Sequence, residues 1–463
     1  MSSTIYTPVR ALSKLIKAGK LSPVALTETF LTRLETYGPR YNAVVTVTRD
    51  LAMKQARRAE KEIAAGKYRG PLQGIPYGAK DLLDTAGIPT TWGAIPLRGR
   101  VPNKDATVVR KLEQAGAILV GKLAMIELAG GAGYRQPNAS LTGPPRNPWD
   151  PETWTGGSSS GSGACVAAGL VPFAIGSETW GSILSPANNC GVAGLRPTYG
   201  RVSRHGAMAL CWTLDKIGPL CQNADDLGLV LETIAGPDPL DSTTIQEPWS
   251  YSTVTPRRKF KIGVPKMVAD DANTTVKQNF ETALDVLRGF ASVDEVTLPD
   301  LPYEAVTRTI LNAESVSAFE DLIESGAIGG LTAPEDHWGP YTRTVLPASD
   351  YIRALRLRRK MMEAIADVME GFDALAAPSG KKPATPLGQE FRKVAPGATS
   401  DPMGAIGNGC GLPAVSVPDG FTATGLPTGI QFMGTPDSEN TLLAIARVYQ
   451  SRTSWHTWHP KLV

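Results

Sequence analysis

The chain has 463 residues, of which 42% are hydrophobic and 20% are charged, a composition typical of a folded protein and unlike that of a disordered one. Single cores usually stop growing near ~250–300 residues, so the length predicts two domains or one unusually large domain. The net charge of +3 is small and the basic residues are dispersed, which excludes a polyanion-binding surface and therefore nucleic acid as an expected partner.

The N-terminal segment 1–10 lacks the apolar run of a secretory signal, and no stretch of about 18 apolar residues occurs anywhere in the sequence. We therefore expect a cytoplasmic protein with no membrane partner. The five cysteines are an odd number without CxxC spacing, which predicts buried thiols and supports neither a disulfide framework nor a metal site.

Helical spacing of apolar residues predicts two amphipathic helices within residues 11–37. They are separated at Leu21-Ser22-Pro23, where Ser22 can cap the second helix and Pro23 can open it. A third helix, charged on most faces, is predicted over residues 52–66.

After Gly70 the sequence changes to short apolar runs bounded by glycine and proline, as at 74–78 and 117–121. These runs are typical of buried strands. The order of strand, glycine-rich turn and helix recurs as far as Arg196, which predicts an α/β fold with a large mixed or mostly parallel sheet flanked by helices.

The polar, proline-bearing segment 236–259 is a candidate surface excursion between the two halves of the chain. Beyond it, helices are predicted over 275–290 and 349–369. Residues 411–434 return to strand-like runs, which we expect to complete the same sheet.

Small residues dominate Gly156–Gly163 and the nearby segment Gly176–Ser182. A flexible linker is one interpretation, but an apolar helix-to-strand pattern follows directly and embeds the segment in a core. A phosphate loop is another, but no lysine follows the glycines in a GxxxxGK[ST] pattern. The third is a catalytic loop whose backbone amides and hydroxyls converge on a reacting carbonyl.

A serine nucleophile requires a base. The chain has four histidines, and no GxSxG motif accompanies them, so a Ser-His-Asp triad lacks a motif. Lysine can serve instead if burial lowers its pKa. Lys80, at the end of the apolar run 74–79, fits that role, although its position beside Asp81 and Asp84 is also compatible with a surface ion pair.

At these residues the sequence resembles the amidase-signature family. The lysine segment 74–81 is similar to the lysine motif of the family, 156–169 to its Gly/Ser-rich signature, and 176–182 to its nucleophile loop. Further agreement extends over 190–203, 218–220, 411–418 and 425–431. The resemblance covers essentially the whole chain and implies a single domain over 1–463, with the N-terminal helices of 1–66 packed on its core.

The family triad of serine, bridging serine and lysine falls on Ser182, Ser158 and Lys80. The spacing from Ser182 agrees with the family register and selects Ser158 from the neighbouring serines. In the family a cis peptide precedes the bridging serine, which here would be the bond Gly157–Ser158. The resemblance also implies an oxyanion hole made by the backbone amides of Thr179, Trp180, Gly181 and Ser182, with no metal and no organic cofactor.

Three positions of the nucleophile loop depart from the usual family sequence Asp-Thr-Gly-Gly-Ser-Ile-Arg. Glu178 stands for the aspartate, Trp180 for a glycine and Leu184 for the arginine. Either the backbone at Trp180 does not need a positive φ, or the loop adopts a local variant. Trp180 and Met125 are candidate residues of an apolar substrate pocket.

The resemblance implies a serine hydrolase that cleaves an amide, carbamate or ester of a small molecule. In that mechanism Lys80 is the base, Ser158 relays the proton and Ser182 forms the acyl-enzyme. Two alternatives are a tRNA-dependent amidotransferase subunit that needs partner subunits and a non-catalytic binding protein on the same fold. The sequence does not predict the oligomeric state.

Overall fold

The computed structural model describes residues 4–133, 135–390 and 400–462, and its centre is an 11-stranded sheet. In spatial order the strands are β1 (Val44–Val47), β3 (Ile118–Leu123), β2 (Pro76–Lys80), β6 (Phe173–Glu178), β8 (Lys216–Cys221), β7 (Ala193–Arg196), β12 (Ala414–Phe421), β13 (Pro427–Met433), β11 (Ala374–Pro378), β9 (Phe260–Pro265) and β10 (Ala291–Val296). Strand β2 is parallel to β3 and β6, whereas β6, β7 and β8 pair antiparallel. The predicted large mixed sheet is confirmed.

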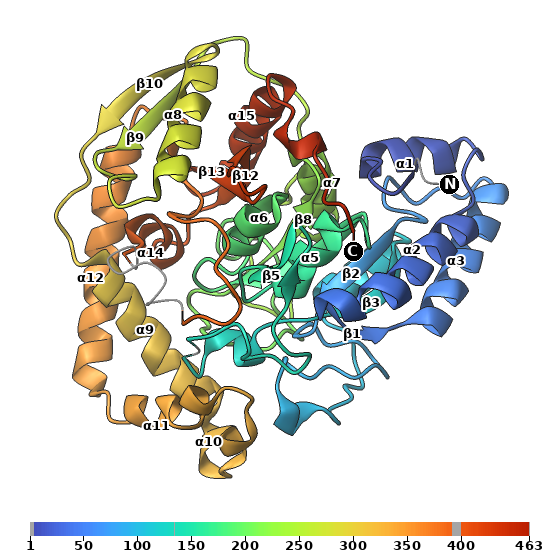
Figure 1. Cartoon of the computed structure of the whole chain (residues 1–463), viewed down its shortest axis with the longest axis horizontal. Helices are drawn as coiled ribbons and strands as arrows, with labels where there is room; N and C mark the ends of the chain where they lie inside the picture. Colours follow the sequence, from blue (N-terminus) through green and yellow to red (C-terminus); the bar gives the residue numbers. More distant parts are fainter. Residues whose placement is uncertain (1–3, 134, 391–399, 463) are drawn as a thin grey trace.

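Helices cover the sheet along its whole length, as Figure 1 shows. They are α1 (Val9–Lys17), α2 (Pro23–Tyr37), α3 (Arg49–Ala64), α4 (Thr107–Gln114), α5 (Ser160–Ala167), α6 (Leu184–Cys190), α7 (Ala224–Ile234), α8 (Thr274–Arg288), α9 (Tyr303–Ala318), α10 (Glu320–Glu324), α11 (Gly339–Arg343), α12 (Ala348–Met369), α14 (Pro402–Gly409) and α15 (Glu439–Ser451). A separate two-stranded sheet pairs β4 (Arg146–Asn147) with β5 (Asp150–Trp154). Helices α1–α3 lie at one end of the molecule and α8 with β9 and β10 at the other.

The first two helices follow from local sequence. Ser22 accepts a hydrogen bond from the Ala25 amide at 3.1 Å, and Pro23 occupies the first helical position of α2. One face of α2 buries Leu26, Phe30 and Leu34. Each such side chain contributes roughly 1.5–3 kcal/mol when fully buried, so packing on the sheet stabilises α2 far more than its cap does.

Buried side chains of the N-terminal helices belong to the same continuous core as those of the sheet. This continuity supports the prediction of a single domain, which stays a prediction. Residues 236–259 contain no helix or strand, in agreement with their polar sequence. Asp238 nevertheless anchors this segment, because its buried carboxylate accepts hydrogen bonds from Thr107 and Ser203.

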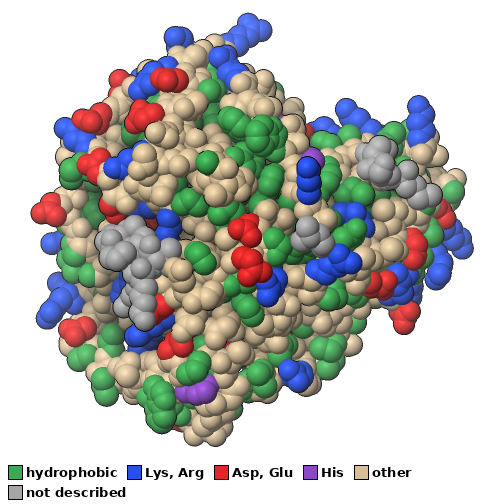
Figure 2. Space-filling view, viewed as in Figure 1, with side chains coloured by type: hydrophobic (Ala, Val, Ile, Leu, Met, Phe, Trp, Pro, Cys, Tyr) green, Lys and Arg blue, Asp and Glu red, His purple; other side chains and the backbone are tan. Residues whose placement is uncertain are grey.

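On the face shown in Figure 2, basic and acidic side chains are interspersed, and no extended surface of one sign is seen there. All five cysteines are free and buried, as predicted. No helix in the described part of the chain is both long and apolar enough to cross a membrane.

Candidate active site

Lys80 is the last residue of β2, and its side chain is completely buried. Its Nζ lies 2.7 Å from Ser158 Oγ, 3.0 Å from Ser159 Oγ and 3.0 Å from Ser177 Oγ. The surface ion pair considered from the sequence is wrong, because Asp81 pairs with Lys122 and Asp84 with Arg100. The lysine is surrounded by hydroxyl groups and has no carboxylate partner among the described ion pairs.

Burial lowers the pKa of Lys80 to about 7, although the negative charges of Asp215 and Glu178 act in the opposite direction. A buried ammonium without a paired carboxylate loses its hydration, which favours the neutral amine. Near neutral pH a substantial fraction of Lys80 can therefore accept a proton.

The Gly/Ser segment is part of the core and not a linker. Gly157–Ser158 is a cis peptide bond, and helix α5 begins at Ser160 with every residue buried. Small residues are required here, since a Cβ on Gly161 would lie 2.3 Å from the carbonyl oxygen of Ala43. The segment thereby brings the hydroxyls of Ser158 and Ser159 against the ammonium group of Lys80.

Ser182 lies in the loop between β6 and α6, beside this segment. The Ser159 amide donates to the Ser182 carbonyl at 3.2 Å, and the Ser182 residue is 7% exposed. Lys80, Ser158 and the Ser182 loop thus converge at the ends of β2 and β6, which are adjacent parallel strands. A buried amine, a bridging hydroxyl and an accessible serine in this order can move a proton from Ser182 towards Lys80.

The buried carboxylate of Glu178 shapes the nucleophile loop. It accepts hydrogen bonds from the Ile183 and Leu184 amides at 2.8 and 3.0 Å, and Arg196 Nη1 lies 2.8 Å from its other oxygen. Burial by itself would raise the pKa of the Glu178 carboxyl, but mainly the charge of Arg196 lowers it to about 2. Glu178 is therefore ionised at neutral pH and closes the loop around residues 178–184.

The backbone amides of residues 179–182 donate no hydrogen bond to another protein group within the described part of the chain. Gly181 has a φ of +81°, which turns the backbone immediately before Ser182. Free amides beside a serine hydroxyl are the donors that a developing oxyanion requires. The oxyanion hole predicted at Thr179, Trp180 and Gly181 stays a prediction, which this arrangement supports.

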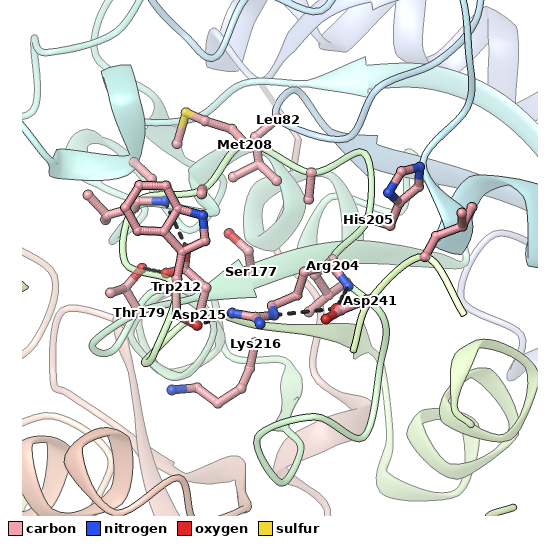
Figure 3. A pocket seen from close by; sticks show the side chains of 16 residues that line it. Leu82, Ser177, Thr179, Arg204, His205, Met208, Trp212, Asp215, Lys216 and Asp241 are labelled. Carbon is pink, nitrogen blue, oxygen red and sulfur yellow. Dashed lines mark hydrogen bonds and ion pairs between the residues drawn. The ribbon is translucent and has the colours of Figure 1, made fainter. Parts of the chain in front are cut away.

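A cavity of about 250 Å³ lies beside Ser177 and Thr179 (Figure 3). Thr179 donates a hydrogen bond to Asp215 at 2.5 Å, and Lys216, Met208 and Trp212 form other parts of the wall. Since Ser177 also contacts Lys80, only this serine separates the cavity from the buried amine.

A family model for amidases matches residues 25–443. The chain belongs to the amidase family. This match confirms the resemblance on which the sequence prediction rested, and with it the fold.

Relatives and solved structures of the amidase family resemble the chain over almost its full length. A glutamyl-tRNA(Gln) amidotransferase subunit of Chloroflexus aurantiacus is 36% identical over 491 aligned residues, which cover 100% of both chains. The peptide amidase of Stenotrophomonas maltophilia is 32% identical with a TM-score of 0.83, covering 96% of this chain and 97% of that one. For the corresponding amidotransferase subunit of Thermotoga maritima the values are 29% and 0.81, with 97% and 95% covered.

The departures from the usual amidase loop have structural explanations. Trp180 does not have a positive φ, so its backbone needs no glycine. The Trp180 indole donates to Asp401 Oδ2 at 2.9 Å, and the guanidinium carbon of Arg308 lies 5.1 Å from the ring centroid. Leu184 is buried in the core, while Arg196 from the neighbouring strand β7 supports the loop carboxylate.

Replacement of Arg196 by methionine should lower the free energy of unfolding by about 3–5 kcal/mol, because it leaves the Glu178 carboxylate buried without its partner. Both side chains are fully buried. Urea denaturation measures the loss. Arg353, whose side chain is 74% exposed on α12, provides the matched control, and Arg353→Met should change stability by less than about 0.5 kcal/mol. Equal stability of the two variants would contradict the assignment of Arg196 as the anchor of the loop.

Other residues singled out from the sequence lie elsewhere. Met125 is completely buried in the core, so its role in a substrate pocket stays a prediction that this position does not favour. No histidine hydrogen-bonds to Ser158 or Ser182 among the described contacts. Within residues 4–133, 135–390 and 400–462, no group of three or more His, Cys, Asp or Glu side chains could hold a metal ion.

Sequence reasoning missed two further hydroxyl partners of Lys80, namely Ser159 and Ser177. It also missed the support of Glu178 by Arg196 and by Asn408, whose Nδ2 lies 3.1 Å from Glu178 Oε1. Ser177 could have been suggested by its position five residues before Ser182, at the end of a buried strand. The contact with Asn408 spans 230 positions in the sequence, and no local pattern indicates it.

Proposed function

We propose that this amidase-family chain hydrolyses an amide C–N bond through a covalent acyl-enzyme on Ser182. The observation that carries the proposal is the fully buried Lys80, with Nζ 2.7 Å from Ser158 Oγ beside the Ser182 loop. A charged surface lysine could not act as a base at neutral pH, whereas an amine with a pKa of about 7 can.

The proposed reaction begins when neutral Lys80 takes a proton from Ser158 while Ser158 takes one from Ser182. The Ser182 oxygen attacks the amide carbonyl, and the oxyanion accepts hydrogen bonds from the free amides of residues 179–182. Ser158 returns a proton to the leaving nitrogen as the C–N bond breaks. Water, deprotonated through the same relay, then cleaves the acyl ester and restores Ser182.

The first candidate substrate is the amide of a small molecule. The peptide amidase of S. maltophilia shares the fold at 32% identity, and its name describes an amide substrate. Carbamates and esters pass through a similar tetrahedral intermediate, so we keep them as substrates to be tested. No contact in the described site favours either of them over an amide.

The second candidate is an amidotransferase subunit that works with partner subunits. The identity to the C. aurantiacus protein extends over both chains from end to end, and the corresponding protein of Geobacter metallireducens is 34% identical over 96% of each chain. These relatives favour the amidotransferase setting over carbamate or ester hydrolysis. In that setting the same Ser182 chemistry would release ammonia from a carboxamide.

One assay separates the candidates. The wild-type protein and Ser182→Ala are incubated with glutamine and with one aryl acyl group presented as anilide, carbamate and ester. Turnover of the anilide that is absent from the variant supports a stand-alone amidase. Release of ammonia from glutamine only after co-expression with partner subunits supports the amidotransferase. Equal hydrolysis by both proteins would refute the assignment of Ser182.

A further inference from the structure

A recess of about 230 Å³ next to the nucleophile loop is lined by three arginines. Arg135 belongs to the loop after β3, Arg308 to α9 and Arg343 to the end of α11, so three separate segments contribute one guanidinium each. Glu335 is the one carboxylate on the described wall of the recess, and its Oε1 accepts the backbone amide of Arg135 at 3.0 Å. The wall is therefore strongly cationic.

These guanidinium groups have no carboxylate partner in the part of the chain that the structure describes. Arg343 donates to the Gly131 carbonyl and to Ser315 Oγ at 3.4 Å, and Arg308 stacks on Trp180. Asp336 is buried nearby, and burial together with the neighbouring Glu127 raises its pKa, so it adds little negative charge at neutral pH. Glu304, one turn before Arg308, instead accepts hydrogen bonds from Ser400 and the Asp401 amide.

The recess adjoins the proposed site of chemistry through Arg308 and Trp180. The Arg308 guanidinium lies over the indole of Trp180 at 5.1 Å, and Trp180 stands two residues before Ser182. Asp401 fixes the other side of the indole through Nε1. A substrate held with its carbonyl at Ser182 would therefore extend along Trp180 towards the arginines.

We propose that the substrate of this site carries a carboxylate, which binds in the recess formed by Arg135, Arg308 and Arg343. The proposal rests on the proposed amide hydrolysis and adds the chemical class of the substrate. Planar guanidinium groups bind carboxylates through paired, charge-assisted hydrogen bonds. A recess of this size accommodates one such group, and the carboxylate would neutralise charge that the described protein leaves unpaired.

Calorimetric titration of the Ser182→Ala protein tests the proposal without any turnover. N-Phenylsuccinamic acid presents a carboxylate on the acyl side of an anilide, and 4-butyramidobenzoic acid presents one on the leaving-group side. Each acid is compared with its methyl ester at pH 7 and low ionic strength. At least one acid should bind about tenfold more tightly than its ester, the effect expected of a hydrogen bond to a charged group, and the pair that responds identifies the side.

The variant Arg308→Gln, made in the Ser182→Ala background, should reduce this preference to less than about threefold, since it removes one charge-assisted pair. Arg308→Lys should retain part of it, and Arg353→Gln, on the exposed surface of α12, should leave it unchanged. Because any shift of Trp180 would affect acid and ester alike, the ratio of the two affinities reports the charge.

Equal affinity for acid and ester in both pairs, an unchanged preference in Arg308→Gln, or no binding of either acid at millimolar concentration would each overturn the proposal. Failure of the proposed function gives a different result. A wild-type protein that cleaves no amide could still bind the acids preferentially, whereas a working amidase without a carboxylate site would cleave acid and ester equally well.

Discussion

Ser182→Ala should lower kcat/KM for amide hydrolysis by a factor on the order of 10⁴ to 10⁶, the loss typical of removing a serine nucleophile from an acyl-transfer site. Without the hydroxyl no acyl-enzyme can form, and only the free amides of residues 179–182 and substrate binding remain to accelerate attack by water. The measurement is single-substrate kinetics on the best amide found for the wild-type protein. Intact-protein mass spectrometry after exposure to a fluorophosphonate should show one adduct on the wild type and none on the variant.

Ser162→Ala is the control for this experiment. Ser162 lies in the same Gly/Ser segment and is equally buried, but it donates to the Ile175 carbonyl and does not contact Lys80. This variant should keep most of the activity. If Ser162→Ala were as inactive as Ser182→Ala, loss of packing in the segment would explain both results, and the nucleophile would have to be sought elsewhere.

Lys80→Met should reduce kcat/KM by a factor of about 10² to 10⁴, the contribution of a well-placed general base. Methionine has a similar volume and no charge, so burial should not destabilise the variant as it would a charged side chain. In the wild type, kcat/KM should rise with pH up to about 7 and remain level above it, because only the neutral amine accepts the proton. The direction follows from a pKa that burial has lowered.

The measurement is a pH profile of both proteins between about pH 5 and 9, with near-ultraviolet circular dichroism as the control for folding. The variant should lose the rising limb near pH 7 together with its activity. An unchanged limb in Lys80→Met would show that another group titrates there. The buried Lys216, whose pKa burial also lowers, would then be the next residue to replace.

Local features of the fold could be predicted because the determining residues are neighbours in sequence. Ser22 and Pro23 start α2, and the predicted helices at 275–290 and 349–369 correspond to α8 (Thr274–Arg288) and α12 (Ala348–Met369). The glycines of segment 156–163 indicated close packing, which the structure has. The candidate residues Lys80 and Ser158 could be named from their motifs, and the structure places them in contact.

The rest of the site depends on contacts between distant segments. The sheet places β12 and β13 between β7 and β11, so the order of its strands does not follow the order of the chain. Nothing near Trp180 in the sequence indicates that Asp401 and Arg308 hold its indole. The same is true of Ser177, whose hydroxyl reaches Lys80 across 97 positions.

The anchoring of Glu178 by both Arg196 and Asn408 sets an order of events during protein synthesis. A ribosome that has released the first 200 residues has already made every member of the proposed triad, but the residue that completes the support of the nucleophile loop is still unmade. Such a nascent chain also lacks β12, the sheet neighbour of β7. Hydrolytic activity should therefore appear only after nearly nine-tenths of the polypeptide has been translated, and fragments truncated before α14 should be inactive although they contain Lys80, Ser158 and Ser182.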